Sequence, residues 1–172
     1  MSVHEHADGG AGDRDTLRAA PNVAGLYHYD DGTFLSGRSS VGNCFGCGAS
    51  NERGLQLRFR LLDDDRVATT VEVPAYLCGV DGIVHGGIQT TILDEVSGVA
   101  AQLWLPDGSS DAPCVTAELA LRFRRPVSQR GPVTAVARVL RREGRSLFVD
   151  AAIVDDDGTE LTTATSRWVQ LT

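Results

Sequence analysis

The sequence of 172 residues contains no lysine, because all 16 of its basic residues are arginine. Without a side-chain amine, the protein cannot form a Schiff base and has no lysine nucleophile or general base. Acidic residues outnumber basic ones by 23 to 16, and the formal net charge is −7. This balance argues against a general nucleic-acid binder or a membrane-surface binder. We therefore expect a partner that is neither a nucleic acid nor a membrane.

Long apolar runs are also absent, and the opening stretch MSVHEHADGGAGDRD lacks the apolar segment of a secretion signal. Cysteine is scarce, and four cysteines without an export signal indicate reduced thiols more than a disulfide framework. These absences favour a cytoplasmic protein. With 42% apolar residues, the chain can still bury one core, so we expect a single domain.

The first part of the chain differs in composition from the rest. Residues 1–20 are mostly Gly, Asp, His and Ala, which leaves almost nothing to bury, and residues 21–42 mix aromatic and turn-forming residues. His4 and His6 resemble a metal-binding pair but have no scaffold around them. We predict a flexible N-terminal arm and lead-in over 1–42 and one folded domain over 43–172.

Hydrophobic periodicity predicts two strands, one long helix and four more strands. The predicted strands are 54–62, 66–74, 115–123, 133–142, 146–154 and 161–171, the predicted helix is 86–105, and 75–85 is predicted to be a loop. The apolar stripe of the helix contains Ile88, Ile92, Val96, Val99 and Leu103. One helix cannot cover both faces of so large a sheet, so the sheet should curl around the helix.

A histidine and two glycines, His85, Gly86 and Gly87, stand at the start of the predicted helix. Glycines there let a ligand approach backbone N–H groups at the positive end of the helix, as stabilising an oxyanion requires. Asp94 follows nine residues after the histidine. Nine residues span about 13–14 Å of helix, so His85 and Asp94 should not touch within one chain. A site that uses both must be completed by another element or another subunit.

Asp94 lies on a small, polar flank of the predicted helix together with Ser97, away from the apolar stripe. The helix has only two charged residues, Asp94 and Glu95, which indicates that it is enclosed nearly all round. A carboxylate in such a place is costly unless it is paired, hydrogen-bonded or functional. We predict a functional role for Asp94, whereas Glu95 is nearer the apolar stripe and is open to interpretation as a structural acid.

These features together resemble the hotdog-fold thioesterases. The likeness rests on HGG, the acid nine residues later, one apolar helix after two strands, and four strands that include 115-VTAELALRFRRPV-127. It is closest to acyl-CoA thioesterases of the phenylacetate-degradation type, and the opening 43-NCFGCGASNERGLQLRF-59 extends it over roughly 43–171. The resemblance implies an α+β hotdog fold, in which a curled antiparallel β-sheet wraps around one long central helix. It also implies an acyl-CoA substrate, no cofactor, and a homodimer or homotetramer with sites shared between subunits.

The resemblance further implies roles for individual residues. Gly86 would present its N–H to the thioester carbonyl, with His85 beside it, and Asp94 would act as general base or nucleophile. Thr116 would assist near the hydrolytic water. His85 itself fits a structural hydrogen bond at the turn better than it fits a base. Some relatives carry an asparagine six residues before the histidine, where this chain has Gly79.

Substrate contacts are expected beside the reacting groups and in a basic zone. The expected contact residues are Gly87, Glu95, Ser97, Arg124 and Arg125. Between Arg122 and Arg145 the sequence has eight arginines and one acid. Such a zone in an acidic protein favours one anionic ligand, such as the phosphates of coenzyme A, over a polymer. Solvated arginines on exposed strands remain an alternative interpretation.

The Cys44–Cys47 pair raises the question of a metal. Zinc needs four ligands, typically in two close pairs, and Cys78 and Cys114 are single and 36 residues apart. A thioredoxin-like pair would begin a helix, whereas this pair precedes a turn and a strand. We therefore predict a turn with two buried thiols and no metal, although a zinc site completed in space by His85 is left open.

Acyl-CoA thioester hydrolysis is the function that these observations favour. The main alternative is a non-catalytic acyl-CoA or small-ligand binding protein, which the loss of a polar side chain at Gly79 supports. A hotdog dehydratase or hydratase would need its own histidine and acid motif, and its flanking sequence is not found. A metal-dependent module is the remaining alternative.

Overall fold

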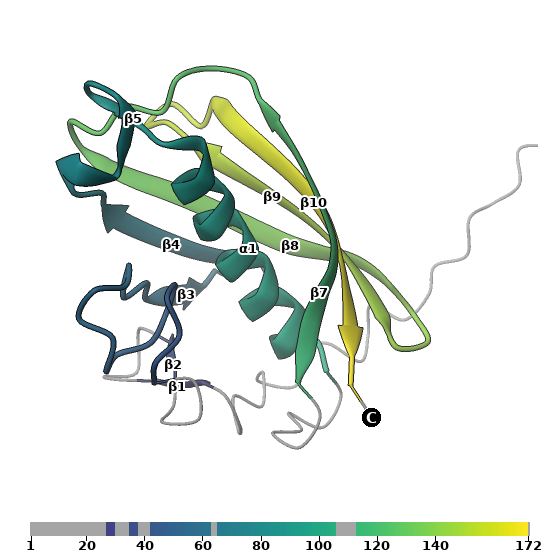
Figure 1. The fold of residues 1–172 in the computed structure, drawn as a ribbon. Helices are drawn as coiled ribbons and strands as arrows, with labels where there is room; N and C mark the ends of the chain where they lie inside the picture. The colour runs from purple at the N-terminus through teal and green to yellow at the C-terminus, as the bar shows by residue number, and fades with distance from the viewer. Residues whose placement is uncertain (1–26, 30–34, 38–41, 63–64, 106–112, 172) are drawn as a thin grey trace, which may run out of the picture.

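A computed structural model of the chain describes residues 27–29, 35–37, 42–62, 65–105 and 113–171 (Figure 1). The predicted arm, with His4 and His6, lies outside the described residues. Neither helix of the described part is long and apolar enough to cross a membrane.

An antiparallel sheet of eight strands forms the body of the domain (Figure 1). The strands are β1 (Tyr27–Tyr29), β2 (Leu35–Gly37), β3 (Phe59–Leu61), β4 (Val67–Glu72), β7 (Cys114–Phe123), β8 (Pro132–Glu143), β9 (Ser146–Val154) and β10 (Glu160–Gln170). Their order across the sheet is β1-β2-β3-β4-β8-β9-β10-β7, so β7 lies at an edge. The last four predicted strands are confirmed within one or two residues, because alternating side chains and tight turns define them.

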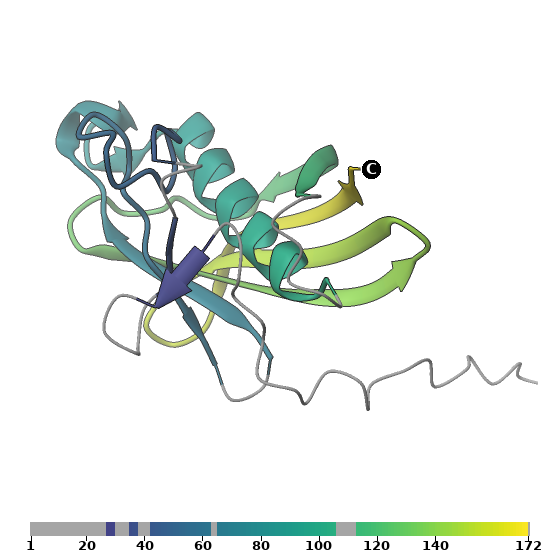
Figure 2. The ribbon, with the colours of Figure 1, turned by 90° about the horizontal axis from the view of Figure 1, so that it is seen from below.

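The helix α1 (Gly86–Leu103) lies across one face of this sheet (Figures 1 and 2). Its predicted apolar stripe is confirmed, since Ile92, Val96 and Val99 are fully buried against the strands. Each side chain of this kind stabilises the fold by about 1.5–3 kcal/mol when it leaves water. The predicted arrangement of one long helix packed against a large antiparallel sheet is confirmed.

The predicted strand over 54–62 is wrong in length, because only Phe59–Leu61 pairs in the sheet. Gln56 has a left-handed backbone (φ 47°), which interrupts an extended strand. The preceding amides bond elsewhere: Leu55 N–H donates to the Phe45 carbonyl and Leu57 N–H to the Gly46 carbonyl, each at 2.8 Å. The turn around the cysteine pair therefore supplies the carbonyl acceptors that a neighbouring strand would otherwise have supplied to these amides.

The segment predicted as a loop over 75–85 contains short regular structure. A 3₁₀ turn, η3 (Ala75–Leu77), leads into a small hairpin of β5 (Cys78–Val80) and β6 (Ile83–Val84). Gly82 provides the left-handed residue of its turn (φ 73°). This hairpin delivers the chain to the start of α1.

The sheet also includes residues before position 43. Strand β2 pairs with β3 through Leu35 and Phe59, and β1 pairs with β2. Part of the predicted lead-in thus continues the sheet.

Candidate active site

The turn at the start of α1 is fixed by His85. The ring Nδ1 of His85 accepts a hydrogen bond from Gly87 N–H at 2.9 Å, and the backbone N–H of His85 donates to the Leu77 carbonyl at 3.0 Å. The ring thus caps the helix, as the structural interpretation of His85 predicts. Because the cap occupies Gly87 N–H, the N–H of Gly86 is the one in this Gly-Gly pair with no acceptor among the described residues. Gly86 therefore has a backbone donor available for an oxyanion at the positive end of the helix.

An exposed aromatic residue from the edge strand lies beside this amide. A Cβ placed on Gly86 would be 3.4 Å from the ring of Phe123, the last residue of β7. Phe123 is 57% exposed, and the segment before His85 also exposes Tyr76 in η3 and Val80 in β5. The Phe123 ring therefore makes the immediate surroundings of the Gly86 amide apolar.

Asp94 lies further along α1, on the side that faces the other end of β7. Its Oδ1 accepts a hydrogen bond from Thr116 Oγ1 at 2.9 Å. Burial raises the pKa of the Asp94 carboxyl above its usual range, and the Thr116 hydrogen bond offsets part of that rise. A carboxylate whose pKa is shifted toward neutral pH is suited to accept a proton from water.

A β-bulge directs Thr116 toward the helix. In the pairing of β10 with β7, Arg167 lies opposite Glu118 but Trp168 lies opposite Thr116, so Ala117 is an extra residue. Side chains alternate between faces along a regular strand, so Thr116 and Glu118 would otherwise share a face. The extra residue reverses the alternation of side chains before it, so Thr116 faces the helix and reaches Asp94. Sequence alternation alone does not reveal such a bulge.

The structure thus brings Asp94 and Thr116 together and keeps them apart from the HGG turn. Gly86 and Asp94 are eight residues apart on one straight helix, a span of about 12 Å. One thioester carbonyl is too small to contact both groups within a single chain. Each chain thus carries two candidate half-sites: one at Gly86 beside Phe123, the other at Asp94 beside Thr116.

Glu95 and Ser97, both predicted as substrate contacts, have different surroundings from Asp94. The carboxylate of Glu95 faces the cysteine turn and accepts a hydrogen bond from Cys44 Sγ at 3.1 Å. Ser97 is fully buried, and its Oγ has no hydrogen-bond partner among the described residues. Neither residue contacts Asp94 through a hydrogen bond within the described part of the chain.

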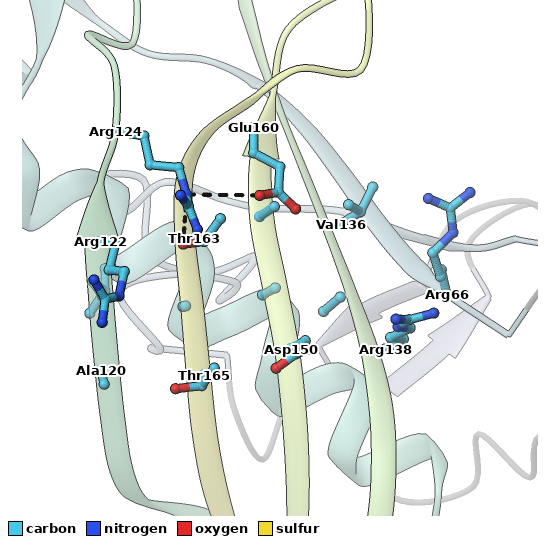
Figure 3. A pocket seen from close by; sticks show the side chains of 15 residues that line it. Arg66, Ala120, Arg122, Arg124, Val136, Arg138, Asp150, Glu160, Thr163 and Thr165 are labelled. Carbon is cyan, nitrogen blue, oxygen red and sulfur yellow. Dashed lines mark hydrogen bonds and ion pairs between the residues drawn. The ribbon is translucent and has the colours of Figure 1, made fainter.

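The predicted basic zone includes an open groove of about 1010 Å³ on the outer face of the sheet. Figure 3 shows Arg122, Arg124 and Arg138 in front of the strands, with the helix behind them. Arg124 Nε donates to Thr163 Oγ1 at 3.4 Å and lies 3.8 Å from Glu160 Oε2. Arg124 therefore faces away from Asp94 of its own chain.

Two buried glutamines that sequence analysis missed attach the helix to the sheet. Gln89 donates to the Val84 carbonyl at 2.8 Å and accepts from Thr162 Oγ1 at 2.6 Å. Gln102 accepts from Cys114 N–H at 3.1 Å, which joins the end of α1 to the start of β7. In the sequence, each of these glutamines is a polar residue at a position that the helical pattern predicts to be buried. The pattern does not identify the hydrogen-bond partners.

Gly79, the position of the missing asparagine, lies against the capping histidine. A Cβ placed there would be 3.1 Å from Cδ2 of the His85 ring, which is tighter than an ordinary contact. A larger side chain at this position would have to displace the ring. In this protein the glycine therefore permits the close packing of hairpin and cap.

The hotdog fold is defined by one long helix packed on a large antiparallel sheet, as in this chain. Here the amide at the helix start and the acid in the middle of the helix both lie along one edge strand. The sequence profile of the Thioesterase superfamily matches residues 81–162, which include the helix and both half-sites. Over those residues the chain is similar to the proteins of that superfamily.

Individual proteins are also similar to this chain. The acyl-coenzyme A thioesterase THEM4 of Mus musculus is 29% identical over 126 residues, which make up 71% of this chain and 52% of the mouse protein. The chain thus spans about half the length of this relative.

Solved structures show the same fold. A thioesterase superfamily protein is 29% identical with a TM-score of 0.61, and the match covers 71% of this chain and 57% of that one. A phenylacetic acid degradation-related protein of Ralstonia eutropha JMP134 is 28% identical with a TM-score of 0.58, covering 67% of this chain and 85% of that one.

Proposed function

We propose that this protein hydrolyses an acyl-CoA thioester to a free acid and coenzyme A. The observation that carries the proposal is the partly buried Asp94 carboxylate, which accepts a hydrogen bond from Thr116 of β7. Asp94 lies on the same helix as Gly86, whose backbone N–H is open to a ligand. The name of the THEM4 relatives, acyl-coenzyme A thioesterase, supports the substrate class.

The geometry suggests how each group would act. The Gly86 N–H donates a hydrogen bond to the carbonyl oxygen of the thioester and stabilises the negative charge that develops there. Thr116 occupies Oδ1 of Asp94, so Oδ2 is available to take a proton from water as the water attacks the carbonyl carbon. The tetrahedral intermediate then collapses, the C–S bond breaks, and the CoA thiolate leaves with the proton from Asp94. Direct attack by Asp94, followed by hydrolysis of the anhydride, is the other route open to the same carboxylate.

A second subunit would bring the two half-sites together. The β7 edge has no strand on its outer side within the described residues, and a long bare edge is a template for pairing with another chain. Thr116 and Phe123 lie on either side of the middle of β7. If two copies pair antiparallel about a two-fold axis between Leu119 and Ala120, close to that middle, Thr116 of one lies opposite Phe123 of the other. Asp94 of one subunit then approaches Gly86 of the partner subunit, so the proposed enzyme is a homodimer or an assembly of such dimers.

The coenzyme A phosphates would bind near the HGG turn. Arg124 and Arg125 directly follow Phe123, which lies beside Gly86. Arg125 is exposed. Arginine pairs well with phosphate because its planar fork donates two parallel hydrogen bonds. Arg125 is the stronger candidate, since Arg124 already has Thr163 and Glu160 as partners.

The test is thiol release from short, medium, long and aryl acyl-CoAs by the wild type, Asp94→Asn and Asp156→Asn. The Asp94 variant should lose at least about 10²-fold in kcat, as the loss of a catalytic acid–base group does. Asp156 is an exposed turn residue away from both half-sites, so its variant is the matched control. Full activity in a folded Asp94→Asn protein would overturn the proposed role.

Gly79 favours a second candidate, a protein that binds acyl-CoA without turning it over. A side chain at position 79 would press on the His85 ring, and the glycine here supplies none of the polar groups that some relatives place there. Measurable binding of acyl-CoA by the wild type, with no thiol release from any acyl class, would establish this candidate and exclude hydrolysis.

A further inference from the structure

The cysteine turn and the middle of the helix meet in a cluster of three potential metal ligands. The Sγ atoms of Cys44 and Cys47 and a carboxylate oxygen of Glu95 all lie within 4.8 Å of one another. Two of the ligands come from the turn at 42–50, and the third comes from α1. Spacing along the sequence could not reveal this group, because Glu95 is 48 residues after Cys47.

The turn that carries both thiols has a fixed shape. Gly48 N–H donates to the Cys44 carbonyl at 3.0 Å, and Ser50 N–H donates to the Gly42 carbonyl at 3.0 Å. A Cβ on Gly48 would lie 2.4 Å from the Gly42 oxygen, so the turn closes only around a glycine. Both sulfur atoms are thus positioned by backbone bonds before any ion binds, which lowers the entropic cost of binding.

The same turn closes tightly over Glu95. A Cβ on Gly46 would lie 2.2 Å from Cγ of Glu95, so any larger residue at position 46 would displace the carboxylate. Cys47 is 4% exposed, and Cys44 and Glu95 are half-buried. No cationic side chain pairs with this carboxylate among the described residues; it accepts a hydrogen bond from the Cys44 thiol at 3.1 Å and also interacts with the Cys47 thiol. A half-buried carboxylate beside two thiols lacks a positive charge, which a divalent cation would supply.

We propose that Cys44, Cys47 and Glu95 bind a zinc ion that joins the cysteine turn to the helix. Two soft thiolates and one carboxylate form a donor set that selects zinc over calcium or magnesium. With Zn–S of about 2.3 Å and Zn–O of about 2.0 Å, a tetrahedral site places sulfur and oxygen about 3.5 Å apart. The present 3.1 Å between Cys44 Sγ and Glu95 Oε1 needs only a small expansion.

Water would occupy the fourth position of the tetrahedron. Binding converts the two thiols to thiolates and releases their two protons to the buffer. The ion would hold the turn against α1 at the residue next to Asp94. This inference rests on the cluster alone and holds whether or not the protein hydrolyses a thioester.

The first experiment measures metal binding by the full chain, purified, reduced and stripped of metal. We expect one zinc per chain, measured by elemental analysis after removal of free ion. Cobalt, used as a spectroscopic probe, should give a thiolate-to-metal charge-transfer band and the intense visible bands of a tetrahedral site. His4 and His6 could bind cobalt adventitiously, but imidazole produces no thiolate band. A reduced wild type that takes up no zinc, or binds cobalt without a thiolate band, overturns the proposal.

The second experiment assigns the ligands. Cys44→Ser with Cys47→Ser should abolish the thiolate band, whereas Cys78→Ser with Cys114→Ser, the matched control, should retain it. Glu95→Gln should weaken zinc binding at least about tenfold, since even changes to groups that only hydrogen-bond to a metal ligand weaken metal sites about 10- to 100-fold. Zinc should raise the Tm of the wild type and of the control but not of the Cys44/Cys47 variant. An unchanged thiolate band in the folded Cys44/Cys47 variant, or unchanged affinity in Glu95→Gln, would show that the ion binds elsewhere.

Discussion

The hydrogen bond between Thr116 and Asp94 sets the charge state of the proposed catalytic acid. Burial raises the pKa of Asp94, and the Thr116 hydroxyl partly counteracts this by stabilising the carboxylate. Removing the hydroxyl removes the stabilising contribution and leaves the desolvation, so the pKa of Asp94 should rise further.

Thr116→Val is therefore expected to shift the acidic limb of the pH profile to higher pH. Proton abstraction needs ionised Asp94, so kcat/KM falls as the pH drops through the pKa of this carboxyl. A higher pKa moves that fall toward neutral pH. The measurement is kcat/KM against pH for the wild type, Thr116→Val and Thr165→Val, the last altering a residue on the outer face of the sheet. If the limb does not move in Thr116→Val, the hydroxyl does not act on Asp94.

Ser97 and Ser166 offer a matched test of buried hydroxyl groups. Ser97 Oγ has no partner among the described residues, whereas Ser166 Oγ accepts a hydrogen bond from Trp168 Nε1 at 2.9 Å. Ser97→Ala should leave the free energy of unfolding unchanged or increase it by about 1 kcal/mol, because it removes an unsatisfied group. Ser166→Ala should decrease it by about 1–3 kcal/mol, because the indole N–H loses its acceptor.

Urea unfolding of the two variants measures both changes. A marked loss of stability in Ser97→Ala would mean that its hydroxyl has a structural partner, contrary to the expectation. If Ser97→Ala instead keeps its stability but raises KM, the earlier assignment of Ser97 as a substrate contact is supported.

At the scale of single residues, the sequence indicated candidate residues but not the side chains that surround them. Asp94 could be found because a charge on a nearly apolar helix is costly without a role. The surroundings of Glu95 could not be found, since its partners are cysteines far away in the chain. The orientation of Thr116 depends on one extra residue, Ala117, and alternation alone gives no sign of it.

At the scale of elements, one glycine determines how closely α1 approaches the sheet. A Cβ on Gly98 would lie 2.7 Å from the ring of Trp168 on β10. Gly98→Ala should therefore destabilise the protein by about 1–3 kcal/mol, the usual cost of overpacking a core, despite alanine's higher helix propensity.

Gly131→Ala is the matched control for that prediction. A Cβ there meets nothing within 4 Å, and Gly131 does not have a left-handed backbone. The free energy of unfolding of the Gly131→Ala variant should stay the same or rise slightly, because alanine restricts the unfolded chain. Thermal and urea unfolding of both variants provide the measurement. Equal effects of the two substitutions would show that the Gly98–Trp168 contact does not limit the packing.

The elements themselves were predictable wherever one pattern ran without interruption. The helix and the four strands after it have long, regular periodicity and strong turns between them, such as the one with left-handed Gly144 (φ 58°). The strand over 54–62 has equally good alternation, yet only three of its residues pair in the sheet. Its first residues bond to the cysteine turn, a tertiary competition that alternation does not reveal.

At the scale of the whole molecule, the length of α1 makes a one-chain active site implausible. Gly86 and Asp94 lie two helical turns apart, and both border the edge strand β7, which pairs with β10 and has no strand on its outer side among the described residues. The sequence already indicated this separation through simple helix geometry. The register of any pairing through β7 is not encoded in a local pattern, so a shared site needs a functional test.

Two inactive variants should restore each other's activity if the site is shared. Asp94→Asn removes the acid. Gly86→Pro removes the N–H at the first helical position, where proline is well tolerated, and His85 already has the extended backbone (φ −57°, ψ 138°) that precedes proline. Each homodimer should lose about 10²-fold or more in kcat. A mixed dimer has one site with both defects and one with none.

Refolding an equal mixture of the two variants gives mixed dimers in half of the molecules, so about one quarter of the wild-type activity should return. The measurement is thiol release from acyl-CoA before and after co-refolding, with each variant refolded alone as the control. If each site lay within one chain, every site in the mixture would carry one defect and no activity would return. Recovery can therefore occur only if Gly86 and Asp94 meet across the subunit boundary.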